Sequence, residues 1–568
     1  MAFLVALIFL FAISLVYSIV PTTSFMKFIQ KVFFVVGTVC LGTLQVFSQT
    51  AGKTENLPTD YLSKEFHAGR RQALRDLMPA NSVTVIFSYP DQVFSNDVNY
   101  VYHANPDLYY FSGYKEPNSI LLIFKDIQAD GDSSYNELFF VRHRDPLREQ
   151  VTGKRLGVEG VKAQLGFKRV YNSEAFVDFP IDYKKFSAVF YDSPPEDVTG
   201  DGSAGELKNL VSTFKTKAAI PHVDKQLLDD LTLIGKYGSP SNLNRLVTAY
   251  LKPKLNKEAY KNSPIIQELI NKPDSATLAD VKTKISTAFG NISSYADFTN
   301  TLRGIKTPEE LVLLKKSVEI SSIAHAEIMR AIKPSLSERE LEGIFMYMHK
   351  KYGAEDEGYP PIVGAGANAC ILHYEENNAT KLDNQLTLMD VGAEYHGYSA
   401  DVTRTVPANG KFTDEQRAIY QLVYDAQEEV FKLCKEGVVY SSVEKKATEV
   451  LAAGLIKLGL IKNASEVRKY YPHGCSHHLG LDVHDKGAYN GTLMANMVIT
   501  VEPGIYIPAG SPCDKKWWNI GVRIEDDVLI GKSGGTLLSI DAPRKWQDVE
   551  KMVAEKSIFD NASFPELK

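Results

Sequence analysis

Cysteine is scarce in this chain, which has five cysteines in 568 residues. One of them, Cys40, lies in an N-terminal apolar segment, and the other four are widely spaced: Cys370, Cys434, Cys475 and Cys513. Domains that depend on disulfides have a much higher density of cysteine, so the sequence excludes a disulfide framework. We expect these four residues to be small, buried, apolar side chains.

The chain also lacks an excess of basic residues. Lys and Arg number 63 against 69 Asp and Glu, a formal net charge of −6. Because nucleic-acid binding depends on a basic surface, the composition gives no electrostatic case for a nucleic-acid partner. Hydrophobic residues at 44% and charged residues at 23% are ordinary globular values, which excludes a disordered or collagen-like chain. The length fits two or three domains of about 150 residues.

Long hydrophobic runs are confined to the N-terminus. Phe3–Val20 has no charged residue and is long enough to span a bilayer. Met26, the charges of Lys27 and Lys31, and an apolar core over Val32–Val46 then have the order of a secretory signal. We therefore predict a signal region over residues 1–49, with Met26 as the true start.

Cleavage of that signal near residue 49 implies an exported protein, periplasmic or secreted, with no stable membrane insertion afterwards. The mature chain loses Lys27 and Lys31 and no acid, so its formal charge becomes −8. The alternative is that Phe3–Val20 is an uncleaved membrane anchor.

The remaining chain divides into four regions. Residues 58–192 contain short, continuous apolar runs typical of buried strands, at Val83–Phe87, Ile120–Phe124 and Leu138–Val141. Turn-forming residues then open a linker and a mostly helical connector over 193–305. A catalytic domain is expected over 306–535, opening with a capping threonine, Thr307, before Pro308. A tail follows over 536–568.

Two aspartates in the last third of the chain lie on a predicted hairpin. The midpoint between Asp390 and Asp401 falls between Tyr395 and His396, so a tight turn there would place the two carboxylates directly opposite each other. Like charges in that position destabilise a sheet, and a cation between them would remove the cost. The alternative is a pair of solvated acids on an edge hairpin.

Two glutamates lie on a second predicted hairpin, which pairs Ile499–Ile507 with Gly521–Ile530. Glu502 and Glu525 both stand among apolar residues, where an ionised carboxylate needs a partner or a metal. Between the hairpins, four of the twelve histidines of the chain fall within twelve residues, at 473, 477, 478 and 484. That density favours a catalytic or metal-binding segment.

The donor atoms of these residues indicate the class of metal. Two Asp, two Glu and one His form an oxygen-rich set, unlike the cysteine clusters of structural zinc sites. Such a set suits Mn²⁺ foremost, with Co²⁺, Zn²⁺ or Fe²⁺ as alternatives. Four carboxylates can also bridge two ions about 3.5–4 Å apart, as in two-metal hydrolases.

Taken in order, these motifs resemble the metal-binding series of the pita-bread metallopeptidases, and among these most closely the aminopeptidase P family. The resemblance is dense over residues 306–535 and extends into 60–190. The segments that carry it are Ile371–Asn377, Met389–Glu394, Ala400–Thr405, His473–His484, Thr500–Gly504 and Val522–Asp526, with Ser95–Asp97, Tyr109–Gly113 and Glu116-Pro117 in the N-terminal region. It implies an α+β chain with a pita-bread C-terminal domain and a smaller α/β N-terminal domain.

The resemblance also implies a role for each site residue. The implied metal ligands are Asp390, Asp401, His477, Glu502 and Glu525, of which Asp401 and Glu525 would bridge two divalent ions. His373 and His484 would hydrogen-bond the substrate and the tetrahedral intermediate. His473, Tyr506 and Arg523 would line a pocket for proline. Residues 200–300 have no counterpart that allows an inference.

The implied reaction is removal of the N-terminal residue from peptides with proline in second position. A water that bridges two metal ions is hydroxide-like near neutral pH and would attack the Xaa-Pro carbonyl carbon. Glu502 would accept and return its proton, as a catalytic acid and base. We also expect a homo-oligomer, either a dimer or a tetramer.

Four other functions are alternatives to this one. Prolidase shares the fold, the metals and the proline pocket but cuts only dipeptides, and the sequence does not separate it from aminopeptidase P. Methionine aminopeptidase is disfavoured because that family lacks a large N-terminal domain. A metal-free pita-bread binding module and creatinase-like chemistry are both disfavoured by the complete set of five ligands.

Overall fold

The computed structural model describes residues 59–560, apart from short gaps at 193–194, 196–197, 199, 201 and 221–223. The predicted signal region 1–49 and the proposed start at Met26 lie outside the described residues. The described residues from Leu62 onward form one compact unit. Within the described part of the chain, no helix combines the length and the apolarity needed to cross a membrane.

The N-terminal domain is built on a five-stranded mixed sheet with the order β6-β5-β4-β1-β7. Its strands are β1 (Ser82–Phe87), β4 (Ile120–Asp130), β5 (Ser133–Val141), β6 (Val170–Asn172) and β7 (Ala188–Tyr191). The three apolar runs of the sequence form β1, β4 and β5. These strands lie at the centre of the sheet, and their apolar runs are buried. The prediction of buried strands is confirmed.

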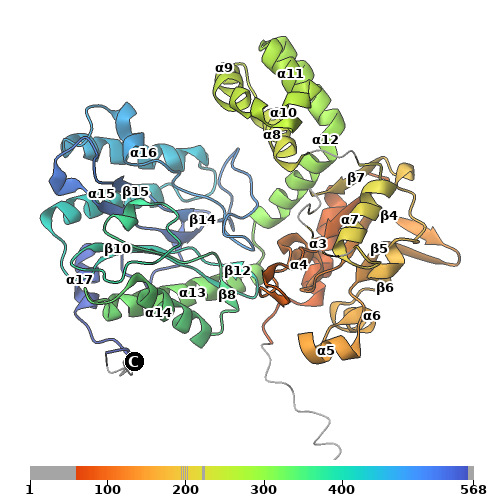
Figure 1. Cartoon of the computed structure of the whole chain (residues 1–568), viewed down its shortest axis with the longest axis horizontal. Coiled ribbons are helices and arrows are strands. Elements are labelled where there is room, and N and C mark those ends of the chain that lie inside the picture. Colours follow the sequence, from red (N-terminus) through yellow and green to blue (C-terminus); the bar gives the residue numbers. More distant parts are fainter. Residues whose placement is uncertain are drawn as a thin grey trace, which may run out of the picture. The chain divides into compact units, whose positions relative to one another are not determined.

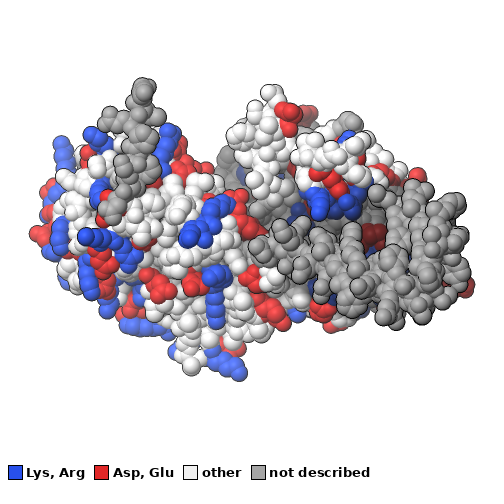
Figure 2. Space-filling model, turned by 90° about the horizontal axis from the view of Figure 1, so that it is seen from below, with Lys and Arg blue, Asp and Glu red and all other residues white. Residues whose placement is uncertain are grey.

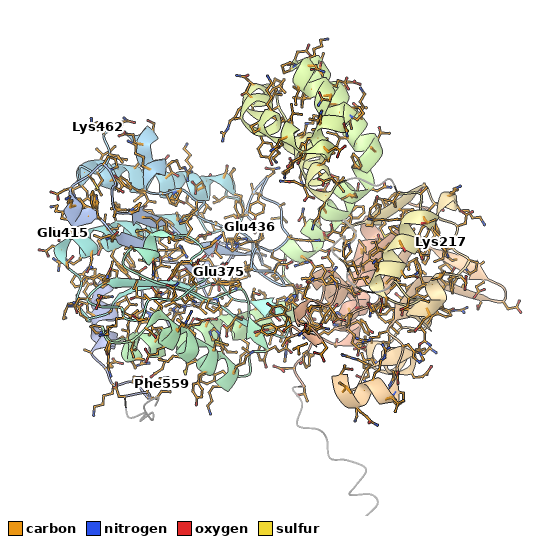
Figure 3. The ribbon with its side chains drawn as sticks, viewed as in Figure 1. Lys217, Glu375, Glu415, Glu436, Lys462 and Phe559 are labelled. Carbon is orange, nitrogen blue, oxygen red and sulfur yellow. The ribbon has the colours of Figure 1, made fainter. Side chains whose placement is uncertain are left out.

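Helices cover both faces of this sheet. Side chains of α3 (Lys64–Leu77) and α4 (Pro106–Ser112) share a core with Ile86, Leu121 and other strand residues on one face. On the opposite face α7 (Leu207–Lys217) packs against alternate residues of the same strands. Lys217, labelled in Figure 3, ends α7 and donates to the carbonyl of Phe179 at 2.7 Å, which ties the helix to the domain.

A helical connector follows α7, within the region 193–305 for which the sequence predicts a linker and mostly helical structure. Its helices are α8 (Lys225–Tyr237), α9 (Leu243–Arg245), α10 (Glu258–Asn262), α11 (Pro264–Asn271) and the long α12 (Ser275–Gly304). They enclose a small core of their own around Leu231, Tyr260 and Val281. The last turn of α12 leads directly into the C-terminal domain.

The C-terminal domain opens with α13 (Pro308–Ala331). Thr307 caps this helix in a capping box with Glu310, which confirms the predicted start. Figure 1 shows α13 and α14 (Glu338–Lys351) on one side of the central strands and α15 (Asp414–Phe431) and α16 (Ser441–Lys457) on the other.

The strands between these helices form small antiparallel sheets. One sheet has the order β13-β10-β9, a second β12-β11-β8, a third β14-β17-β18, and β15 pairs with β16. Their bounds are β8 (Asp356–Glu357), β9 (Ile362–Ala365), β10 (Leu386–Asp390), β11 (Ala393–Tyr395), β12 (Tyr398–Ser399), β13 (Thr403–Pro407), β14 (Val498–Val501), β15 (Gly504–Ile507), β16 (Ile520–Arg523), β17 (Asp526–Leu529) and β18 (Thr536–Leu537). The predicted second hairpin is confirmed, since β14 pairs with β17 and β15 with β16 in one continuous register.

The register of the first hairpin differs from the prediction. Asp390 lies opposite Thr403, not opposite Asp401. The turn is at His396-Gly397, where both residues have positive φ (51° and 87°), one residue later than expected. A two-residue turn of this kind fits the twist of a hairpin. The resulting shift in register is two residues, so Asp390 and Asp401 remain on the same face of the ladder.

On the described part of the face seen in Figure 2, basic and acidic residues are interspersed.

The four cysteines of the described residues are free thiols. Cys434 and Cys475 are buried as expected. Cys370, at the end of a short 3₁₀ helix (Asn368–Cys370), and Cys513, in a bend, are partly exposed.

Candidate metal centre

The two hairpins bring buried carboxylates together at one point. Tyr359 donates its hydroxyl hydrogen bond to Asp390 Oδ1 at 2.6 Å and to Asp401 Oδ1 at 2.8 Å. The two carboxylate oxygens are therefore separated by no more than the sum of these distances. The predicted proximity of the two aspartates is confirmed, although they are diagonal rather than directly opposite neighbours.

His477 reaches the same point from the loop between the hairpins. Its backbone is fixed on β14, because its N–H donates to Thr500 Oγ1 at 3.1 Å and its carbonyl accepts from the Thr500 N–H at 3.0 Å. Its Nδ1 donates to the His478 carbonyl at 3.0 Å. Nε2 is left facing Asp401 Oδ2 at 3.3 Å and Glu502 Oε1 at 3.6 Å. A backbone bond at Nδ1 is the usual support for a histidine that binds metal through Nε2.

Glu525 completes the group. Ligand atoms of Asp401, His477 and Glu525 all lie within 4.8 Å of one another, and Thr403 donates to Glu525 Oε2 at 2.6 Å. The ladder places Glu502 and Glu525 at matching positions, at the break between the two strand pairs. All five residues predicted as metal ligands thus converge on one centre, in which Asp390, Asp401 and Glu525 are buried and His477 and Glu502 are partly exposed.

The electrostatics of this centre favour a bound cation. Burial, and then the charges of Asp401 and Glu502, raise the pKa of Glu525 well above its usual range. Burial and the neighbouring aspartates raise the pKa of Glu502 to about 7. Burial alone would lower the pKa of His477, but Asp401 and Glu502 raise it to about 9. A divalent ion would offset this crowding of negative charge, so the donor set fits the metal class expected from the sequence.

Three further side chains form a continuous contact beside the carboxylates. His473 Nε2 lies 2.9 Å from the Tyr506 hydroxyl, and Arg523 donates to that hydroxyl at 2.7 Å. Arg523 also donates to Asp390 Oδ2 at 2.5 Å. Tyr506 on β15 and Arg523 on β16 point to the same side as the glutamates, because even spacing along a strand keeps residues on one face.

His484 and His373 lie at the edge of the centre, and both are exposed. The ring of His484 contacts that of His477, with 4.3 Å between the ring centroids. Loss of water from part of its ring, and then the proximity of His477 and His373, lower the pKa of His484 to about 4. His478 is different, because it is fully buried and its Nε2 lies near the Ala488 carbonyl at 3.4 Å. The choice of His477 over His478 agrees with this geometry.

Sequence reasoning missed three residues of the centre. Tyr359 joins the two aspartates, Thr403 supports Glu525, and Asp527 accepts from the Asp401 N–H at 3.1 Å. Asp527 is fully buried, and burial together with Asp401 raises its pKa well above the usual range. Its position two residues after Glu525, on the same face of a strand, is a signal that could have identified it.

The sequence also matches two family models. Residues 312–532 match metallopeptidase family M24, and residues 67–185 match the aminopeptidase P N-terminal domain. The Xaa-Pro aminopeptidase of Escherichia coli (strain K12) is 31% identical over 504 residues, which cover 87% of this chain and 98% of that protein.

Solved structures agree with these matches. Aminopeptidase P from E. coli with the inhibitor Pro-Leu has a TM-score of 0.65 at 29% identity. The zinc-substituted E. coli enzyme in complex with product has a TM-score of 0.66 at 28% identity. Both comparisons cover 87% of this chain and 98% of the other.

The two-part architecture, the buried cluster of carboxylates with His477 and the family matches define a metallopeptidase with the pita-bread fold. More particularly, the chain belongs to the aminopeptidase P family, and it is a metallo-aminopeptidase.

Proposed function

We propose that this enzyme removes the first residue from peptides with proline in second position, and that it uses two divalent metal ions. The observation that carries the proposal is the convergence of the five expected ligands beside the contact of Arg523 with Tyr506 and His473.

The ligand set supports a site for two ions. Asp390 and His477 would each bind one ion, Glu502 would complete the set, and Asp401 and Glu525 would be shared between the two ions. Two divalent ions, when bound, would lower the pKa of a water molecule and polarise the peptide carbonyl. Manganese remains our expectation for the native metal, because the donors are mainly carboxylate oxygens.

The residues of the chain would perform the remaining steps. Glu502 would accept a proton from the attacking water and return it to the proline nitrogen. His484 and His373 would hydrogen-bond the peptide and the oxygen on which charge develops. Their exposure leaves them accessible to a bound peptide.

The contact of Arg523 with Tyr506 would form one wall of a pocket for the proline ring. Arg523 is 4% exposed and Tyr506 is 3% exposed, so both are held rigidly. Proline has no backbone N–H, so it loses no hydrogen bond against a wall that provides no acceptor for one. Such a wall would bind the proline ring by its shape alone.

The proposed specificity is tested by measuring release of the first amino acid from four peptides: Xaa-Pro, Xaa-Pro-Yaa, a longer Xaa-Pro peptide and an Xaa-Ala-Yaa control. We expect cleavage of the tripeptide and the longer peptide, with poor cleavage of the alanine control. Cleavage confined to the dipeptide would indicate prolidase instead. Equal cleavage of the alanine peptide would contradict both functions.

Location and assembly also remain proposals. The order of charged, apolar and small residues in the first 49 positions supports export to the periplasm or the medium. N-terminal sequencing of the mature protein would test this, with a start near residue 49 or 50 expected. An intact Phe3–Val20 in a membrane fraction would indicate an anchor. We further propose a dimer or tetramer, which light scattering of the purified protein would test.

A further inference from the structure

A buried ion cluster lies where the connector, the N-terminal domain and the histidine loop meet. Arg303, in the last turn of α12, is 1% exposed. Its Nη1 donates to Asp107 Oδ1 at 2.7 Å, and its Nη2 donates to Asp482 Oδ2 at 2.7 Å and also to Asp485. One guanidinium thus joins three carboxylates from two distant parts of the sequence.

Two lysines balance the charge of this cluster. Lys306 donates to Asp485 Oδ2 at 2.7 Å, and Lys486 donates to Asp107 Oδ2 at 2.5 Å. Asp107 receives a further hydrogen bond from the Tyr295 hydroxyl at 2.7 Å. Three cations therefore meet these three carboxylates, and Lys486 also lies 3.5 Å from the exposed carboxylate of Asp192. Burial alone would raise the pKa of Asp107, but Lys486 and Arg303 hold it well below its usual range, so the carboxylate stays ionised.

The cluster holds the loop that carries His484. Asp482 and Asp485 lie on either side of Val483-His484, and both accept from Arg303. The loop is closed by backbone bonds as well, from the Asp485 N–H to the His478 carbonyl at 2.8 Å and from the Gly480 N–H to the Asp482 carbonyl at 3.1 Å. His484 projects from this closed loop onto the ring of His477.

A buried ion network is a poor source of stability, because desolvation of the charges offsets most of their attraction. Such a network instead determines geometry, because the planar guanidinium of an arginine fixes the directions of the carboxylates that it binds. Lysine, a single point charge, would not hold three carboxylates in one arrangement. The cluster is therefore suited to specify one conformation of the loop.

We infer that Arg303 is a positioning residue for His484. It fixes both sides of the His484 loop through Asp482 and Asp485, and it is itself anchored on Asp107 of the N-terminal domain. This inference rests on the substrate-binding role proposed above for His484. It also gives the N-terminal domain a part in catalysis without contact with the reacting atoms.

A double-mutant cycle tests the inference. The variants are Arg303→Gln, His484→Ala and the two together, each measured for kcat and KM on an Xaa-Pro-Yaa peptide. A misplaced catalytic group can cost about 100-fold in rate, so we expect Arg303→Gln to lower kcat/KM by about 10- to 100-fold. In the His484→Ala background the same change should cost only about 2- to 3-fold, because the group that it positions is already absent.

A matched control separates positioning from general loss of structure. Arg71 on α3 is similarly buried, with 3% exposure, and pairs with Glu137 at 2.7 Å without contacting the histidine loop. Arg71→Gln should change kcat/KM by the same factor in both backgrounds. Metal content should be unchanged in Arg303→Gln, since no proposed ligand contacts Arg303, and Arg303→Lys should restore only part of the activity.

Each outcome decides the inference. An equal factor for Arg303→Gln in both backgrounds would overturn it and leave the proposed function intact. Full activity of His484→Ala would refute the role of His484 and the inference with it. If Arg303→Gln does not fold, Asp482→Asn replaces it in the cycle, because the Asp482 side chain is 39% exposed and the change keeps its shape. Its effect should likewise vanish in the His484→Ala background.

Discussion

Replacement of Asp401 by asparagine should stabilise the metal-free protein while it removes the capacity for metal. Asp401 is 5% exposed and lies among Asp390, Glu525 and Glu502, with His477 as its neighbouring cation. Two unit charges 4 Å apart interact by about 4 kcal/mol at an effective dielectric constant of about 20. Burial raises the pKa of Glu525 and of Glu502, so these two groups are partly protonated and repel Asp401 by less than a full charge would. After the attraction to His477 is subtracted, we expect a net gain in unfolding free energy of about 1 to 3 kcal/mol.

Thermal unfolding in EDTA at pH 8 measures this effect. At about 2–4 °C per kcal/mol for a domain of this size, the Tm of Asp401→Asn should exceed that of the wild type by about 2–12 °C. Excess Mn²⁺ should raise the Tm of the wild type by mass action and leave that of the variant unchanged. Asp414→Asn, which removes an exposed acid from α15, is the matched control and should change little. A lower Tm for metal-free Asp401→Asn than for the metal-free wild type would refute the reasoning.

Three further predictions follow from the same centre. The pKa of Glu502 is about 7 in the folded metal-free protein and about 4.3 in the unfolded chain. The folded state therefore binds the proton more tightly, so the stability that Glu502 contributes is full below pH 4 and is lost as the pH rises through 7. Tm measured in EDTA should therefore fall over that range, and more steeply for the wild type than for Glu502→Gln; equal slopes would contradict this. Glu502→Gln should also lower kcat by about 10²- to 10⁴-fold, as expected for loss of an acid–base group, and unchanged turnover would exclude that role. Arg523→Met removes hydrogen bonds to Tyr506 and Asp390, so kcat/KM for Xaa-Pro-Yaa should fall by about 10- to 150-fold, while a retained value would show that the pocket lies elsewhere.

The hairpins of the centre could be predicted because side-chain alternation is a local property. The even spacing of Glu502 and Tyr506, and of Arg523 and Glu525, is enough to put each pair on one face of a strand. The predicted register of the first hairpin was wrong because the turn forms at His396-Gly397, where both residues adopt positive φ. The even size of the shift preserved the shared face of Asp390 and Asp401.

Contacts between distant segments could not be predicted from one sequence. Tyr359 lies in an irregular segment 31 residues before Asp390, and nothing in its local pattern indicates that its hydroxyl joins two aspartates. Asp107, Arg303 and Asp485 are likewise separated by more than 170 residues, and only the tertiary fold brings them together. Such contacts depend on how whole domains pack, which periodicity does not encode.

The central claim is that the centre of Asp390, Asp401, His477, Glu502 and Glu525 holds two divalent ions that hydrolysis of the Xaa-Pro bond requires. The most direct measurement is the rate of cleavage of an Xaa-Pro-Yaa peptide by chelated enzyme during stepwise addition of Mn²⁺, with bound metal determined at each step. We expect no cleavage by the metal-free protein and full activity only as the second equivalent per chain binds. Full activity in the metal-free protein, or a maximum at one equivalent, would contradict the account.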